Sequence, residues 1–193
     1  MPDHEALYQI AEQQGGYFSA AQAREAGFSY SLLSYHMHNG RFERVRPRVY
    51  RLVRFPASSY EDLHVAALQA GPEAVISHDS ALALYDLSDR LPDQVHVTIP
   101  RTGSRRRPEL KLHTNQLKPE DATSYEGLPV TTVSRTLVDV ATAGLAEEQV
   151  RQAIREALHR GLDTRESLVR RATAHGGRIK RLVGETVREG EQP

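Results

Sequence analysis

The sequence predicts an α+β fold in two parts, a small N-terminal unit and a larger mixed α/β domain that ends in a helical tail. The chain has 193 residues, of which 39% are hydrophobic and 26% charged, an ordinary balance for a globular protein with a buried core. The spacing of apolar residues is typical of helices up to Gly40 and of strands directly after it, and a mixture of strand-like and helix-like runs makes up the rest of the chain. We predict that residues 1–54 form the first domain and residues 55–193 the second.

Composition excludes several classes of protein. The chain has no cysteine, so it forms no disulfide, thiolate zinc site or cysteine nucleophile. It has no apolar run of membrane-spanning length, and its first residues lack the basic and then apolar order of a secretory signal. We therefore predict a cytoplasmic protein. No metal-binding or cofactor motif occurs, so we predict neither a metal site nor a cofactor.

Three helices and a short strand are predicted in the first 40 residues. The apolar spacing of residues 3–14 favours a helix, and Tyr17-Phe18 favours a very short strand. Ser19 is suited to cap a helix over residues 20–26, and Ser29 to cap another over residues 30–39 that stops at Gly40. The lengths of the second and third helices and of the turn between them are those of a helix-turn-helix.

A hairpin is predicted directly after the third helix. The β-prone runs 42–45 and 49–53 flank a turn that contains Pro47. A hairpin at this place in the order is the wing of a winged helix-turn-helix. The N-terminal unit is therefore predicted to have that fold.

The third helix of such a unit enters the major groove of DNA, and its two faces differ in chemistry. Leu33 and His36 share the face that should pack inward. The opposite face carries hydroxyl, phenol and imidazole groups that can hydrogen-bond to base edges: Ser31, Ser34, Tyr35 and His38. Because this face has no Arg, Asn or Gln apart from Asn39 near its end, we expect modest discrimination between sequences.

The wing concentrates positive charge in a chain whose formal net charge is zero. Residues 41–54 contain six Arg and one Glu, which gives +5. We predict phosphate contacts from Arg41, Arg44, Arg46, Arg48, Arg51 and Arg54, with the tip Arg46-Pro47-Arg48 able to enter a minor groove. Amides near Ser19 are a further candidate phosphate site. The alternative is a solvated Arg-rich hairpin on a winged helix that binds protein.

The remainder of the chain is predicted to form an α+β domain after a short linker at residues 55–59. Strands are expected over 74–77, 94–99, 109–113 and 127–132, and helices over 60–70, 79–87, 135–143, 146–160, 164–174 and 178–188. A basic stretch between the second and third of these strands holds Arg101, Arg105, Arg106 and Arg107. It is either a second nucleic-acid contact or an exposed loop, and the sequence favours neither.

Nothing in the sequence predicts catalysis. Ser77-His78-Asp79 contains the residue types of a catalytic triad, but sequence neighbours cannot chain hydrogen bonds from nucleophile to base to orienting acid. No nucleophile elbow, P-loop or zinc-protease motif occurs. We therefore predict that the protein is not an enzyme.

Three stretches together resemble one family, the AbiEi-type antitoxins, which are transcriptional regulators of type IV toxin–antitoxin systems. The wing residues 40–45 and 49–52 resemble its winged-helix domain. Residues 74–81 (AVISHDSA) resemble its strand and Ser-His-x-Ser-Ala motif, and residues 127–141 (GLPVTTVSRTLVDVA) its Leu-Pro-Val-Thr and Arg-Thr-Leu-x-Asp signature. The family usually has Gly at the position of Arg48, so with Pro47 in front we expect this wing to turn differently. Asp86 likewise replaces a common Gly after the helix over residues 79–87.

The resemblance implies a function with two halves. One is a repressor that binds inverted repeats in its own promoter, and the other is a C-terminal domain that counteracts a nucleotidyltransferase-like toxin without a stable complex. The residues themselves support only the first half. The alternative is a solitary winged-helix transcription factor whose second domain senses a small ligand.

Overall fold

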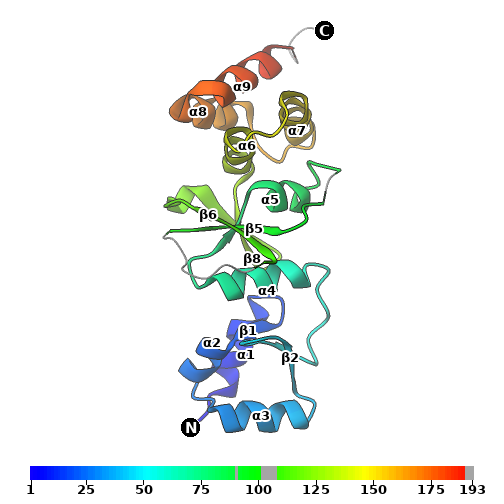
Figure 1. Ribbon diagram of the computed structural model, residues 1–193, viewed down its shortest axis with the longest axis vertical. Helices are drawn as coiled ribbons and strands as arrows, with labels where there is room; N and C mark the ends of the chain where they lie inside the picture. Colours follow the sequence, from blue (N-terminus) through cyan, green and yellow to red (C-terminus); the bar gives the residue numbers. More distant parts are fainter. Residues whose placement is uncertain (90, 101–107, 190–193) are drawn as a thin grey trace. The chain divides into compact units, whose positions relative to one another are not determined.

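A computed structural model describes residues 1–89, 91–100 and 108–189 (Figure 1). Its contacts divide the chain into two compact units. Unit 1 is Met1–Ala74 together with Ser124–Pro129, and unit 2 is Val75–Thr123 together with Val130–Pro193. The domain boundary after residue 54 stays a prediction of the sequence, because grouping by contacts does not test it.

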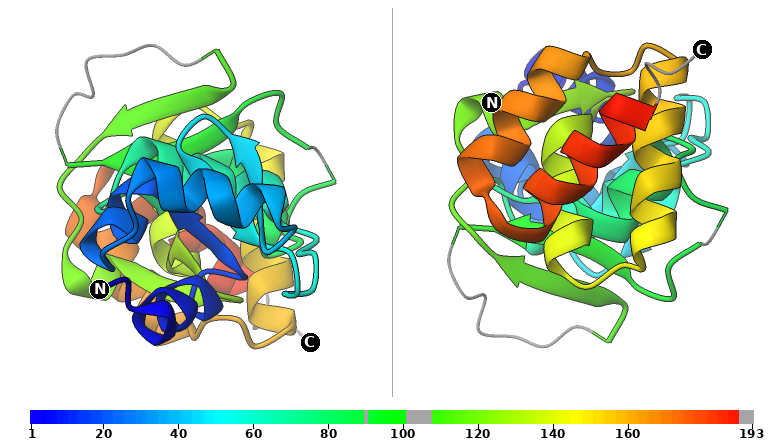
Figure 2. Two further views of the ribbon diagram at one scale, coloured as in Figure 1. Left: turned by 90° about the horizontal axis from the view of Figure 1, so that it is seen from below. Right: turned by 90° about the horizontal axis from the view of Figure 1, so that it is seen from above.

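Unit 1 contains the predicted winged helix-turn-helix, followed by one further helix. Its elements are α1 (His4–Glu12), β1 (Tyr17–Ser19), α2 (Ala20–Glu25), α3 (Tyr30–His38), β2 (Phe42–Arg46), β3 (Val49–Leu52) and α4 (Glu61–Ala70). The strands form an antiparallel sheet in the order β1-β3-β2. From below, α3 lies across the front of this unit beside the β2–β3 hairpin (Figure 2).

The helices of unit 1 begin where their capping residues predict. The Ala6 amide donates to Asp3 Oδ1 at 2.9 Å, and the Leu32 amide donates to Ser29 Oγ at 3.2 Å. Ser19 and Gln22 form a capping box, in which each side chain accepts from the backbone amide of the other. These bonds satisfy amides that have no partner within their helices.

Aromatic rings form the core that holds α3 against the sheet. The Phe18 and Phe42 rings meet edge to face with centroids 5.1 Å apart, and Phe28 and Leu33 are fully buried beside them. Phe18 comes from β1, Phe42 from β2, and Leu33 from α3. The position of α3 therefore depends on apolar contacts to both strands.

His64 is a buried residue of α4 in unit 1. Its ring stacks on Tyr17 with centroids 5.2 Å apart and is 2% exposed. The ring also lies so close to Gly15 that a Cβ there would come within 2.6 Å of Nε2. Burial lowers the pKa of His64 to about 4, so the folded protein holds this imidazole neutral.

Acidification should therefore destabilise unit 1 through His64. The unfolded chain binds a proton on this residue below about pH 6.5 and the folded chain only below about pH 4, so stability falls as pH drops between these values. The slope for one histidine is about 1.4 kcal/mol per pH unit. Urea unfolding at pH 7 and pH 5 measures it, and the His64→Leu variant should show a shallower dependence. Equal slopes in the two proteins would contradict this assignment.

Unit 2 combines a mixed sheet with a group of helices. It holds β4 (Val75–Ile76), α5 (His78–Leu84), β5 (Val95–Ile99), β6 (Leu110–Thr114), the 3-10 turn η1 (Pro119–Asp121), α6 (Val133–Thr142), α7 (Glu147–His159), α8 (Arg165–His175) and α9 (Gly177–Glu189). The strands β7 (Ala122–Tyr125) and β8 (Leu128–Thr131) belong to the same sheet, although their residues Ser124–Pro129 are grouped with unit 1. Among the described residues, no helix is long and apolar enough to span a membrane.

The sheet of unit 2 has the order β6-β5-β4-β8-β7. β4 pairs antiparallel with β5 and parallel with β8, and β5 pairs parallel with β6. The α7 and α8 helices each contact α9, and all three helices contact α6 (Figure 2, right). All predicted strands and helices of this unit are present, and β7 is the one described strand that the sequence did not predict.

A buried ion-pair network joins η1, α6 and α8. Asp121 is 2% exposed, and its Oδ2 accepts from Arg135 Nη1 at 3.0 Å. Arg135 also donates through Nε to Asp139 Oδ1 at 2.9 Å, and Arg171 pairs with Asp121 Oδ1. Arg135 of the Arg-Thr-Leu-x-Asp stretch therefore joins α6 to η1, and Asp139 of the same stretch holds its guanidinium from within α6.

Candidate nucleic-acid interface

The α3 helix presents the polar face that its spacing predicts. Leu33 and His36 are buried, whereas Ser31, Tyr35 and His38 are exposed and Ser34 is half-buried. Tyr35 is 60% exposed, and His38 Nδ1 lies 2.8 Å from the Ser34 carbonyl oxygen. The four side chains share one surface of the helix, and hydroxyl, phenol and imidazole groups there can each bond to a base edge.

A neutral histidine fills the space beneath this helix. His36 is 3% exposed, and its ring centroid lies 4.9 Å from that of Phe42 and 5.2 Å from that of His4. Neither ring nitrogen has a hydrogen-bond partner among the described residues. Burial lowers the pKa of His36, and nearby His4 and Arg41 lower it further. The imidazole therefore packs as an aromatic spacer between α3 and β2.

The wing is a tight hairpin with a bulge at Val45. Arg44 pairs with Tyr50 and Arg46 with Val49, so Val45 is an extra residue and Pro47-Arg48 forms a two-residue turn. Arg48 has a φ of 65°, in the left-handed region that favours glycine. Proline followed by a left-handed residue is the combination of a type II turn. Arg48 therefore takes a glycine-like conformation, at a cost of about 1–2 kcal/mol. That this wing turns differently from those of the family stays a prediction.

The turn is also tied to the start of α2. The Ala20 amide donates to the Arg48 carbonyl oxygen at 2.9 Å, and the Gln22 amide donates to Ser19 Oγ. This contact fixes the wing tip relative to the helix-turn-helix. The Ala20 and Gln22 amides are therefore occupied, and the phosphate site expected near Ser19 stays a prediction.

The arginines of the wing fall into two groups. Arg41, Arg44, Arg46 and Arg48 are exposed, and so is Arg54 beyond β3. Arg51 differs, because its side chain is 17% exposed and donates to Glu43 at 2.7 Å and to the Phe55 carbonyl oxygen at 3.3 Å. Glu43 and the main chain therefore hold the Arg51 guanidinium.

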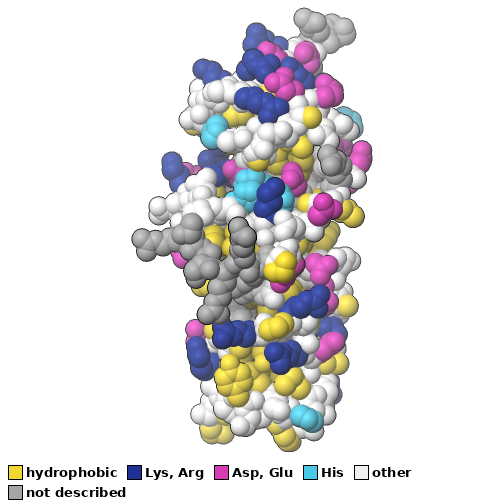
Figure 3. Space-filling model, in the orientation of Figure 1, with side chains coloured by type: hydrophobic (Ala, Val, Ile, Leu, Met, Phe, Trp, Pro, Cys, Tyr) yellow, Lys and Arg dark blue, Asp and Glu magenta, His cyan; other side chains and the backbone are white. Residues whose placement is uncertain are grey.

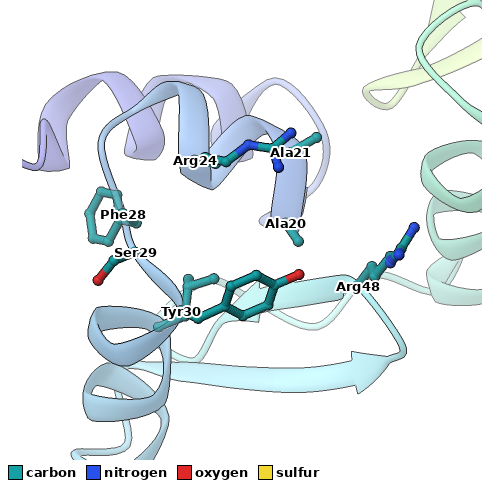
Figure 4. Close-up of a pocket in the computed structure, with 8 residues that line it drawn as sticks. Ala20, Ala21, Arg24, Phe28, Ser29, Tyr30 and Arg48 are labelled. Atoms are coloured by element: carbon teal, nitrogen blue, oxygen red, sulfur yellow. The ribbon is translucent and has the colours of Figure 1, made fainter.

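Arg24 and Tyr30 are two candidate interface residues that the sequence did not predict. A hollow of about 480 Å³ lies among α2, the start of α3 and the wing, with Arg24, Tyr30 and Arg48 among its lining residues (Figure 4). Its floor is apolar and includes Ala20, Ala21, Phe28 and Leu33. Tyr30 is 71% exposed. Figure 3 shows Lys and Arg side chains around exposed hydrophobic ones on this unit. A large exposed aromatic residue in the first turn of α3 was the available signal.

Two other predicted features lie elsewhere in the chain. Arg101, Arg105, Arg106 and Arg107 fall outside the described residues. In the Ser77-His78-Asp79 stretch, Ser77 Oγ lies 2.9 Å from His78 Nδ1, but Asp79 approaches His96 Nε2 at 3.6 Å. Ser77 is fully buried. The acid therefore does not orient the histidine that contacts the serine. Among the described residues, no group of three His, Cys, Asp or Glu could hold a metal ion.

The three helices, the antiparallel sheet and the wing define unit 1 as a winged helix-turn-helix, an architecture that transcriptional regulators use. Residues 5–53 match a family model described as transcriptional regulator, AbiEi antitoxin. Residues 73–184 match the model of the AbiEi antitoxin C-terminal domain. The chain therefore belongs to the AbiEi antitoxin family. No curated protein sequence matches it.

Proposed function

We propose that this protein is a DNA-binding antitoxin that represses its own operon through residues 1–54 and counteracts a nucleotidyltransferase-like toxin through residues 55–193. The proposal rests on one observation: the exposed face of α3 and the exposed arginines of the wing occur on the same unit, in a chain of a transcriptional-regulator family. The protein would act in the cytoplasm and by binding, without catalysing a reaction.

In this proposal α3 reads base edges in the major groove. Ser31, Ser34 and Tyr35 would offer hydroxyl groups, and His38 the ring nitrogen that its bond to Ser34 leaves free. None of these groups forms the bidentate pair with one base that Arg, Asn or Gln can form. Discrimination between operators would therefore be modest and would depend on the sum of several contacts.

The wing and the rim of the hollow would supply phosphate contacts. Arg41, Arg44, Arg46 and Arg48 are exposed cations of the wing, and Arg51 would contribute indirectly by neutralising Glu43. We add Arg24 and Tyr30, whose side chains flank the apolar floor beside Arg48. Such contacts fix the register of the protein and carry no sequence information themselves.

The antitoxin half of the proposal concerns residues 55–193. Its support is the match of residues 73–184 to the AbiEi antitoxin C-terminal domain. Co-expression with the product of the neighbouring gene tests it directly. We expect the chain to restore growth that the toxin arrests, and failure to restore growth would overturn this half.

Gel shifts on the DNA upstream of the operon test the DNA-binding half. We expect retardation of fragments that contain inverted repeats, with log–log salt dependence whose slope is about −0.9 for each phosphate neutralised on the duplex. An unrelated fragment of equal length is the control. Absence of retardation at low salt would overturn this half and leave the antitoxin half standing.

Replacing Tyr35 with Ala should change which operators are bound. Tyr35 is exposed on α3 and its phenol is one of the groups that can contact a base. Loss of a good base contact costs about 1–3 kcal/mol of discrimination, so binding to the operator should fall while binding to unrelated DNA stays constant. Titrations on both DNAs measure the ratio. The variant Tyr8→Ala, which removes an exposed tyrosine from α1, is the matched control.

A further inference from the structure

A second hollow, of about 700 Å³, lies within unit 2 among β6, α6 and α8. Its lining includes His78, His113, Lys118, Asp139, Arg171 and His175. The Ser-His-x-Ser-Ala stretch supplies His78, and the Arg-Thr-Leu-x-Asp stretch supplies Asp139, so two motifs that are far apart in the sequence meet here. The volume falls within the range of about 300–1,000 Å³ that is typical of small-molecule sites.

Two stacked imidazoles form part of one wall. The His78 and His113 rings have centroids 3.5 Å apart and are within 10° of parallel. Burial lowers the pKa of His78 to about 3 and that of His113 to about 4, so both rings are neutral near pH 7. Ser77 Oγ accepts from Thr98 Oγ1 at 2.8 Å and lies 2.9 Å from His78 Nδ1, so the His78 ring is held in place. A neutral ring pair of this kind can stack against a third flat ring.

Asp139 brings an acceptor that the protein leaves unused. The residue is 6% exposed, and its Oδ1 accepts from Arg135 Nε. Its Oδ2 is buried and has no hydrogen-bond partner among the described residues. Such an oxygen costs free energy in the folded chain, and a ligand that donates an N–H to it would recover that cost.

Positive charge lies along the same hollow. Lys118 is exposed, and its ammonium group forms no ion pair within the described part of the chain. Arg171 pairs with Asp121 and donates to the Glu120 carbonyl oxygen at 3.4 Å, so it is largely committed to the protein. Lys118 is therefore the cation that an anionic ligand group can recruit. Exposed amides at Asn115 and Gln116 add further polar contacts beside it.

We propose that this hollow binds a nucleotide, either free or as one unit of a nucleic-acid strand. The base would extend the His78–His113 stack and donate an amino hydrogen to Asp139 Oδ2, while the phosphate lies against Lys118. Adenine, cytosine and guanine carry an exocyclic amine, whereas uracil offers only its ring N3–H between two carbonyl oxygens, which a carboxylate repels, so the site favours the first three. This inference concerns unit 2 alone and does not depend on DNA binding by unit 1.

Isothermal titration of the full chain with the four nucleoside 5′-monophosphates tests the proposal. We expect the three amine-bearing nucleotides to bind more tightly than uridine monophosphate, and guanosine or inorganic phosphate alone to bind more weakly than guanosine monophosphate. Lys118→Ala should weaken monophosphate binding about tenfold, the effect of losing one charged hydrogen bond. Lys180→Ala, which removes an exposed lysine from α9, should leave it unchanged.

The variant Asp139→Asn provides the sharpest readout. Its amide oxygen can still accept from Arg135, and its NH₂ group then faces the hollow as a donor. We expect the preference to shift towards uridine monophosphate, whose base offers carbonyl oxygens at that edge. Mere structural damage would weaken all four ligands equally, and circular dichroism checks that the variant folds. An unchanged order of preference in a folded variant would overturn the proposed role of Asp139.

Two further measurements decide whether the site binds a free nucleotide or a strand, and which result would contradict the proposal. A single-stranded trinucleotide that binds more tightly than its monophosphate would assign the site to a strand, and equal or weaker binding would assign it to a free nucleotide. Both outcomes support the shared chemistry. If none of these ligands binds at millimolar concentration, the proposal is wrong.

Discussion

Replacing Arg46 with Ala and Arg48 with Gly in one variant should weaken binding to every DNA duplex about a hundredfold, because each charged contact contributes roughly a factor of ten. Both side chains are exposed at the wing tip. Glycine at position 48 retains the left-handed conformation that the turn requires, so the charge is lost without damage to the hairpin. The log–log dependence of affinity on salt should become shallower by about 1.8, since two phosphates are no longer neutralised.

The matched control for this variant changes charge without touching the wing. Arg170→Ala removes an exposed arginine from α8 in unit 2 and should leave both affinity and salt slope unchanged. Fluorescence anisotropy on an operator and on unrelated DNA measures all three proteins. If the wing variant lost affinity only for the operator, Arg46 and Arg48 would be reading sequence and their assignment to phosphates would be wrong.

Capping residues and apolar spacing were enough to predict the architecture of unit 1. Ser19 and Ser29 each accept from the amide three residues later, and their helices begin at the next residue. These signals are local, so a single sequence contains them in full. The strand β7 lacked such a signal because Ala122-Thr-Ser-Tyr125 is short, largely polar and has no buried residue. This strand forms because it pairs with β8 in the sheet, and its own sequence pattern does not indicate it.

The candidate interface was predicted less completely than the fold, because exposure depends on partners that are distant in sequence. Arg51 reads as one more wing cation, yet the register of β2 and β3 places it opposite Glu43, and the two form an ion pair. Arg24 lies outside the basic stretch and joins the wing only because Arg48 and α2 meet around one hollow. A count of charges along the chain locates the basic surface and does not show which cations are free.

Family motifs in unit 2 prove to combine structural and unassigned groups. Thr136 Oγ1 contacts Thr131 Oγ1 at 2.7 Å, and the Ser80 hydroxyl accepts from the His96 amide at 2.9 Å, so both side chains fix the backbone around the sheet. In Asp139 only Oδ1 makes a structural contact, to Arg135, and Oδ2 has no hydrogen-bond partner among the described residues. The motif pattern alone could not distinguish these roles, because all the residues involved are buried and polar.

Replacing Asp121 with Ala should destabilise unit 2 by about 3–5 kcal/mol, the cost of removing one partner from a buried ion pair. Asp121 joins Arg135 on α6 to Arg171 on α8, and it also accepts from the Lys118 amide at 3.0 Å. Without it, the Arg135 and Arg171 guanidinium groups lose a shared, buried partner, and among the described residues Asp139 is the carboxylate that still pairs with Arg135. Urea unfolding followed by circular dichroism measures the loss.

An exposed ion pair of similar length shows whether burial causes that cost. Arg155 and Glu148 approach to 2.7 Å on α7, with side chains 49% and 77% exposed, so Glu148→Ala should cost less than about 1 kcal/mol. Arg171→Ala in the Asp121→Ala background tests the same argument from the other side. Removing the second charge should recover part of the stability, because one of the two unpaired cations is then gone. The contrary result is that Arg171→Ala lowers the free energy of unfolding by the same amount in the Asp121→Ala background as in the unchanged protein. The two residues would then be energetically independent, and the network would not hold α6 to α8.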